Sequence, residues 1–134
     1  MKLSTFLSIV GVVAILFGIG FVAAPAEVLA QYGITADRST AFMSRFFGGA
    51  LINVGLIVWF ARNIVDPLSR RSILLAGLIA DVVGFFVALQ GQMKGVANAL
   101  GWSTVLIYGL FAIGFAYFQF APKSLRSDAL ARSH

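Results

Sequence analysis

The sequence is poor in the residues that carry most protein chemistry. It has no cysteine, a single histidine at position 134, and only 11% charged residues, five of them acidic. Without cysteine the chain has no disulfide, no thiolate nucleophile and no sulfur ligand for a metal. Because His134 is the last residue, no histidine lies in an apolar segment to bind haem or zinc or to activate a serine. We therefore predict that the protein is not an enzyme and has no cofactor.

Apolar residues are abundant instead. Hydrophobic residues make up 60% of the 134 residues, and the mean hydropathy is +0.94, which is typical of a membrane protein. They form four runs of about 20 residues, and a helix of that length spans about 30 Å, the thickness of the bilayer core. We predict one all-α domain over residues 1–134, an up-down bundle of four transmembrane helices at about 3–24, 40–61, 70–90 and 99–121, with a polar tail at 122–134.

Local signals refine these boundaries. Pro25 follows the first span and is placed to open a short interfacial helix through 26–31, with Tyr32 and Gly33 as its end. Ser39 or Thr40 is expected to cap the second span. The pair at 66–67, Asp then Pro, has the chemistry of a helix start and places the beginning of the third helix before residue 70.

The basic residues predict the orientation of the chain. The net charge is +5, but lysines and arginines lie at the ends of the apolar runs, so we expect contact with the lipid bilayer and not with nucleic acid. Four crossings place both termini on one side. That side holds Lys2, Arg62, Arg70, Arg71, Lys123, Arg126 and Arg132, against Arg38, Arg45 and Lys94 on the other. The asymmetry predicts cytoplasmic termini in a multi-pass protein of the bacterial inner membrane.

One acidic residue interrupts the third span, in the stretch LLAGLIADVVGFFVALQ. A charged group at the bilayer centre costs about 2.5–3.5 kcal/mol, so Asp81 should turn inward and find partners or bind a proton. Asn53 and Tyr108 lie near the middle of the second and fourth spans, and we expect both to face Asp81. The group is either a proton or cation site or a set of hydrogen bonds that fixes the helix register.

Arginines near the span ends form a second group of candidates. Arg45 lies one turn inside the second span and either contacts an anion or lipid headgroup at the outer face or extends to the interface. Arg62, Arg70 and Arg71 are expected to contact anionic lipid at the inner face, where the same charges set the topology.

Small residues recur within the spans and predict where helices pack closely. Examples are Gly11 and Gly18 in the first span and Gly48, Gly49 and Gly55 in the second. Helices in lipid associate through such residues because they allow the backbones to approach.

Three longer stretches carry a family resemblance. The segments APAEVLAQYGI, RFFGGALINVGLIVWFAR and NALGWSTVLIYGLFAIGFAYF, with the four-span layout, resemble small bacterial inner-membrane proteins grouped under a domain of unknown function. DoxX-like proteins are a more distant analogy, by architecture only. The resemblance implies a bacterial origin and a four-helix fold, and it implies no activity.

Three functions fit these observations. The first is an accessory protein that packs against another membrane protein, against lipid or within a larger complex. The second is an oligomeric transporter or channel component centred on Asp81. The third is a binder of an apolar ligand such as a quinone, pigment or lipid, held among aromatic residues, namely Phe85, Phe86, Tyr108, Phe111 and Phe115.

Overall fold

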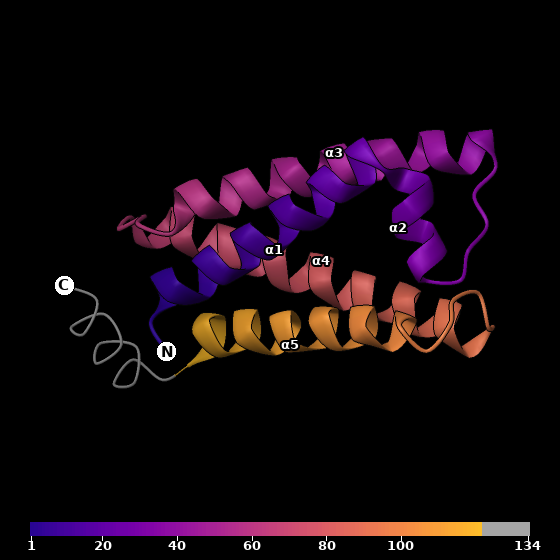
Figure 1. Ribbon diagram of the computed structural model, residues 1–134. Coiled ribbons are helices and arrows are strands. Elements are labelled where there is room, and N and C mark those ends of the chain that lie inside the picture. Colours follow the sequence, from indigo (N-terminus) through magenta and orange to yellow (C-terminus); the bar gives the residue numbers. More distant parts are fainter. Residues whose placement is uncertain (122–134) are drawn as a thin grey trace.

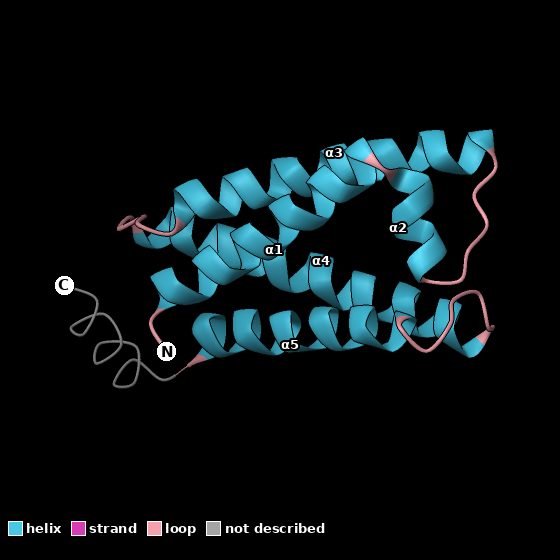
Figure 2. Ribbon diagram, viewed as in Figure 1, coloured by secondary structure: helices cyan, strands magenta, loops and turns pink. Residues whose placement is uncertain are grey.

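The computed structural model describes residues 1–121, and within them all regular secondary structure is helical (Figures 1 and 2). The elements in chain order are α1 (Leu3–Ala23), α2 (Pro25–Gln31), α3 (Arg38–Ala61), α4 (Pro67–Met93) and α5 (Gly101–Phe120). The predicted polar tail at 122–134 lies outside the described residues.

Four of these helices, α1, α3, α4 and α5, are long and apolar enough to cross a bilayer. The predicted four spans and the short helix after the first span are confirmed, and the protein is a multi-pass membrane protein. The orientation of the termini and the identity of the membrane stay predictions. The fourth long helix begins at Gly101, two residues later than predicted.

The starts of α3 and α4 share one capping arrangement. Asp37 precedes α3 and its carboxylate accepts a hydrogen bond of 2.7 Å from the Thr40 backbone N–H, so the predicted cap at Ser39 or Thr40 is wrong by two or three residues. Asp66 precedes α4 and accepts a bond of 2.7 Å from the Ser69 N–H, with Pro67 in the first helical position. Each carboxylate satisfies a backbone donor that the helix itself leaves unpaired.

The Asp66 cap gives a prediction of pH dependence. Hydrogen bonds from the Ser69 side chain and backbone hold the pKa of Asp66 below its usual value. A lowered pKa in the folded state means that the cap contributes fully above about pH 4 and is lost as the pH falls further. We expect the Ser69 amide resonance in micelles to titrate with a midpoint below about 3.9. In Asp66→Asn, which keeps a capping oxygen, the same resonance should stay constant; a wild-type midpoint at or above that value would contradict the cap.

The chain turns sharply at both ends of α2. Ala24 leaves helical geometry between α1 and α2, and Pro25 then starts α2 at a position where its missing N–H is not needed. At the far end Gly33 has φ of +73°, a left-handed conformation that favours glycine. This places α2 across the end of the bundle (Figure 1).

Close backbone contact joins α1 to α3. Gly11 lies opposite Gly55, and Gly18 lies opposite Gly48, and the two glycines on each helix are seven positions apart. A Cβ atom added to Gly18 would lie 2.6 Å from the Gly48 carbonyl oxygen, and one added to Gly48 would lie 2.7 Å from the Gly18 carbonyl oxygen. A Cβ at Gly18, Gly48 or Gly55 would lie less than 3.0 Å from atoms of the facing helix, so these glycines set the distance between the two helices.

Glycine has a different role between α4 and α5, where it receives an aromatic ring. Gly77 lies against the ring of Phe115 and Gly84 lies against the ring of Tyr108. The distance between α4 and α5 is therefore set by aromatic rings that pack against glycine backbone. The same contacts determine which residues of α4 and α5 lie at the same level.

The helices thus form two antiparallel pairs, α1 with α3 and α4 with α5, which diverge towards α2 (Figure 1). We call the two ends of the bundle the α3–α4 end, where that connection lies, and the α2 end. The buried core joins the pairs on the side of the α3–α4 end, where Phe6 packs edge-on against Phe115 with ring centroids 5.0 Å apart. The residues of this packed core cluster are Phe6, Leu7, Val10, Val58, Leu74, Phe115 and Phe118.

Candidate functional site between the helix pairs

A cavity of about 370 Å³ lies between the two helix pairs. Its volume is in the range of small-molecule sites in proteins. All four long helices contribute to its wall, together with α2 and the loop after it. The apolar part of the lining consists of Val10, Val13, Ala14, Phe17, Phe21, Leu29, Ile34, Phe47, Leu51, Val54, Ala80, Ile107 and Phe111.

Polar groups lie along the α4–α5 side of this cavity. Tyr108 is level with Gly84, so Asp81, three residues earlier on α4, lies about 4.5 Å nearer the α3–α4 end. Thr104, one turn before Tyr108 on α5, lies about 6 Å nearer the α2 end, where its hydroxyl is 3.5 Å from the Tyr32 hydroxyl. The cavity therefore offers hydroxyl groups towards α2 and a carboxyl group deeper in the bundle.

The carboxyl group of Asp81 is the most unusual of these groups. Its Oδ2 atom is completely buried and, within residues 1–121, has no hydrogen-bond partner. Buried polar atoms in folded proteins almost always have a partner, and one in an apolar wall is costly to keep without one. Asp81 therefore holds an unused hydrogen-bonding position beside the cavity.

Asn98 links the end of α2 to the segment before α5, at the α2 end of the site. Its backbone N–H donates to the Tyr32 carbonyl oxygen at 2.8 Å, and its side-chain Nδ2 donates to the Gln31 carbonyl oxygen at 3.0 Å. Its Oδ1 also accepts from the Leu100 N–H at 2.9 Å. One residue thus connects the end of α2 to the start of α5.

We expect Asn98→Ala to loosen this link and not the rest of the fold. The variant loses the Nδ2 and Oδ1 bonds, each contributing about 1 kcal/mol, while the apolar core stays intact. Hydrogen exchange of the α2 amides should accelerate several-fold, and exchange in the centre of α1 should not change. Asn98→Asp loses only the donor to Gln31 and keeps the acceptor for Leu100, so α2 exchange should accelerate in this variant as well. Unchanged exchange of α2 in both variants would show that the Asn98 side chain does not hold α2 in place.

Towards the α3–α4 end, the cavity is bounded by aromatic rings. Phe111 lines the cavity and contacts Phe6 edge-on, with ring centroids 6.3 Å apart. Phe6 in turn contacts Phe115 and Phe118 of the buried core. Packed rings therefore occupy the space between Asp81 and the α3–α4 end.

Of the three residues predicted to meet in the membrane, the structure brings two together. Asp81 and Tyr108 line the same cavity. Asn53 does not, because it is exposed on the outside of α3, and the prediction that it faces Asp81 is wrong. At about 100° per residue, Asn53 lies about 140° around the helix from Gly48 and about 160° from Gly55, the residues that contact α1.

The aromatic residues predicted to hold an apolar ligand lie in different parts of the structure. Phe111 lines the cavity, whereas Phe115 is only 1% exposed within the core and Phe86 is exposed on the surface. Phe85 packs against Gly109 and Phe86. The cavity uses other rings that the sequence analysis did not single out, namely Phe17, Phe21, Tyr32 and Phe47. Nothing in the sequence distinguishes these four residues from the other aromatic residues, which occur throughout the spans.

The candidate arginines lie away from the cavity. Arg45 is exposed near the α2 end and, with Arg38 and Phe42, lines a shallow hollow on the surface. Arg62 is engaged locally, because Nη1 donates to the Trp59 carbonyl oxygen at 2.6 Å and the guanidinium lies 4.1 Å from the centre of the Trp59 ring.

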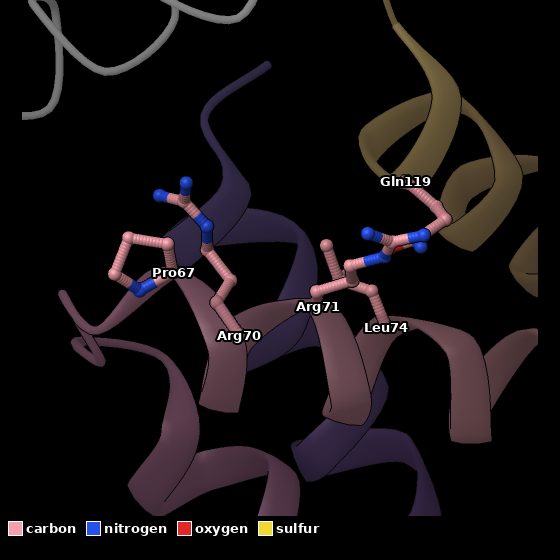
Figure 3. A pocket seen from close by; sticks show the side chains of 5 residues that line it. All are labelled: Pro67, Arg70, Arg71, Leu74 and Gln119. Carbon is pink, nitrogen blue, oxygen red and sulfur yellow. The ribbon is translucent and has the colours of Figure 1, made fainter.

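Arg70 and Arg71 line a separate hollow of about 220 Å³ at the α3–α4 end, with Pro67, Leu74 and Gln119. In Figure 3, the side chain of Arg71 extends towards Gln119, and that of Arg70 extends away from it. Contact of these arginines with lipid stays a prediction.

Comparison of the chain with known protein families, with curated proteins and with solved structures gives no match. The sequence resemblance to small four-span bacterial proteins therefore stays a prediction, and the function is argued from the cavity alone.

Proposed function

We propose that the protein binds an apolar molecule of the membrane between its two helix pairs and holds a polar or cationic group of that molecule at Asp81. The observation that supports this most directly is the buried, unpartnered Oδ2 of Asp81 in the wall of a cavity that is otherwise mainly apolar. Ligand sites commonly combine an apolar lining with a few polar groups that fix the orientation of the ligand. The protein acts by binding, without catalysis.

The chemistry of the wall defines the class of ligand. Aromatic and aliphatic side chains fit a ring or a hydrocarbon chain. The polar residues of the lining offer different hydrogen-bonding groups at the two ends of the cavity. Near α2 the hydroxyls of Tyr32 and Thr104 both donate and accept hydrogen bonds, whereas Asp81 offers a carboxyl group that bonds a donor, a carbonyl or a cation according to its protonation. A quinone, pigment or lipid with a polar group on an apolar body satisfies these requirements.

The transporter hypothesis uses the same carboxyl group and receives less support. A path for protons or cations has to continue from Asp81 towards both ends of the bundle. The rings of Phe6 and Phe111 lie on one side of it, and the Asn98 links lie at the other end. The accessory hypothesis concerns the outer surfaces of the helices and is compatible with a ligand inside.

The test is whether a membrane molecule co-purifies with the cavity. The protein is extracted in mild detergent and examined by native mass spectrometry before and after organic extraction. We expect the wild type to retain an apolar molecule in about stoichiometric amount, and Ala14→Phe, which fills the cavity, to lose most of it. Ala76→Phe places the same ring on the exposed side of α4 and should retain it. Equal retention by the two variants would overturn the proposal.

A further inference from the structure

Asn53 has no use in the fold described so far. It is exposed on α3, eight residues or about 12 Å from the helix end at Ala61, and within residues 1–121 its amide makes no hydrogen bond. Water is absent at that depth of a bilayer, and polar side chains there are satisfied by neighbouring helices. The Asn53 side-chain amide therefore requires a partner outside residues 1–121.

The residues around Asn53 form a regular seam. Phe46, Asn53 and Phe60 are seven residues apart, and Gly49 and Leu56 lie between them at alternating steps of three and four. All five are exposed, and by helical counting they fall within an arc of about 80° on the side of α3 away from Gly48 and Gly55. This is the heptad spacing of a helix that packs against a second helix along its length.

We propose that this seam binds a second copy of the chain, with the two Asn53 side chains hydrogen-bonded to each other. An amide is both donor and acceptor, so asparagine is complementary to itself. Copies inserted with the same orientation have parallel α3 helices, and a two-fold axis along the membrane normal then places both Asn53 residues at the same depth. An asparagine in the first core position of a heptad is a known determinant of parallel two-stranded packing.

Gly49 makes the close approach feasible. A Cβ added at this position meets no atom within 4 Å, so the glycine has no packing role inside the chain. It lies one turn from Asn53 on the same seam, where a missing side chain lets the facing helix come near enough for the amides to bond. The adjacent Gly48 serves the contact with α1, and the paired glycines thus belong to two different faces of α3.

Cysteine cross-linking tests the seam directly, because the natural chain has no cysteine. Single variants Phe46→Cys and Phe60→Cys are reconstituted in liposomes at low protein-to-lipid ratio and oxidised. We expect disulfide-linked dimers from both. Leu110→Cys on α5 is the matched control, because Leu110 and Phe46 are equally exposed at 64%, and it should stay monomeric. Equal dimer yields from the seam and the control, or cross-links in native membranes to a different protein only, would overturn the proposal.

The role of Asn53 is measured separately by energy transfer between labelled copies diluted in lipid. Asn53→Leu keeps an exposed apolar surface and should weaken the dimer about 3-fold to 20-fold, the range of hydrogen bonds between membrane helices. Gly49→Leu should weaken it as well, while circular dichroism of both variants remains that of the wild type. A dimer affinity unchanged in both variants would contradict the proposed contact, whether or not the cavity binds a ligand.

Discussion

Gly48→Ala is expected to destabilise the protein by about 1–3 kcal/mol, the usual cost of forcing an extra methyl group into a packed interior. The new Cβ would lie 2.7 Å from the Gly18 carbonyl oxygen and 2.9 Å from the Val22 backbone nitrogen. Both are backbone atoms of α1, which move only if the whole helix moves. Separation of α1 from α3 would also weaken the contacts at Gly11 and Gly55 further along the same pair.

The neighbouring Gly49 supplies the matched control for this prediction. A Cβ at Gly49 meets nothing within 4 Å, so Gly49→Ala keeps the contact with α1 and gains up to about 1 kcal/mol from better helix propensity. Unfolding is followed by circular dichroism as SDS is added to micelles dilute enough to keep the chain monomeric. Equal stability of the two variants would show that α1 and α3 are farther apart than described.

The sequence predicted the helices well because lipid imposes a strong condition on them. A segment that crosses the bilayer must be both helical and apolar over about 20 residues, and four segments of this chain meet that condition. The short helix was also predictable, because Pro25 and Gly33 act locally at its two ends. The cap at Asp37 was missed because Asp37, Ser39 and Thr40 are all good caps, and only the geometry selects one.

It was harder to predict which side of each helix faces the other helices. In a soluble protein the apolar side of a helix faces the core. In a membrane protein the lipid and the interior of the bundle are equally apolar, so hydrophobicity does not distinguish the two sides. Glycines indicate the packed side of a helix only in part, since Gly48 and Gly49 are adjacent and lie on different sides of α3. Asn53 was predicted to face inward because it is a polar residue at the depth of Asp81, although it lies on the outside of α3. Asp81 and Tyr108 line the same cavity, while the role of that cavity stays a proposal.

The two proposals assign different roles to the two helix pairs. The α4–α5 pair carries the polar side of the cavity, and its rings on Gly77 and Gly84 fix the level of Tyr108 relative to Asp81. The α1–α3 pair supplies a mainly apolar wall and presents the Asn53 seam outward. A dimer through α3 leaves the cavity intact, because the α3 residues that line the cavity, Phe47, Leu51 and Val54, lie outside the arc of the seam.

Asp81→Leu is expected to make the protein more stable and to remove its ligand. Leucine has the same branched arrangement of four side-chain heavy atoms as aspartate and replaces an unpartnered polar atom in an apolar wall, so the free energy of unfolding should rise by up to about 3 kcal/mol. Ligand affinity should fall about 10-fold to 100-fold, the loss expected when a hydrogen bond to a charged group is removed. A residue that costs stability and supports binding is typical of a functional site.

Asp81→Asn distinguishes a ligand bound through a neutral polar group from one bound through a cation. The amide has the same shape and can still bond a carbonyl or a donor, but it cannot be a counter-ion. Retention of the co-purified molecule by Asp81→Asn, together with its loss in Asp81→Leu, would assign a neutral polar group to the ligand; loss in both would assign a cation. Stability and bound molecule are measured on the same preparations, by SDS unfolding and native mass spectrometry. If Asp81→Leu were less stable than the wild type and kept its ligand, Asp81 would have a packing role and the cavity would bind without it.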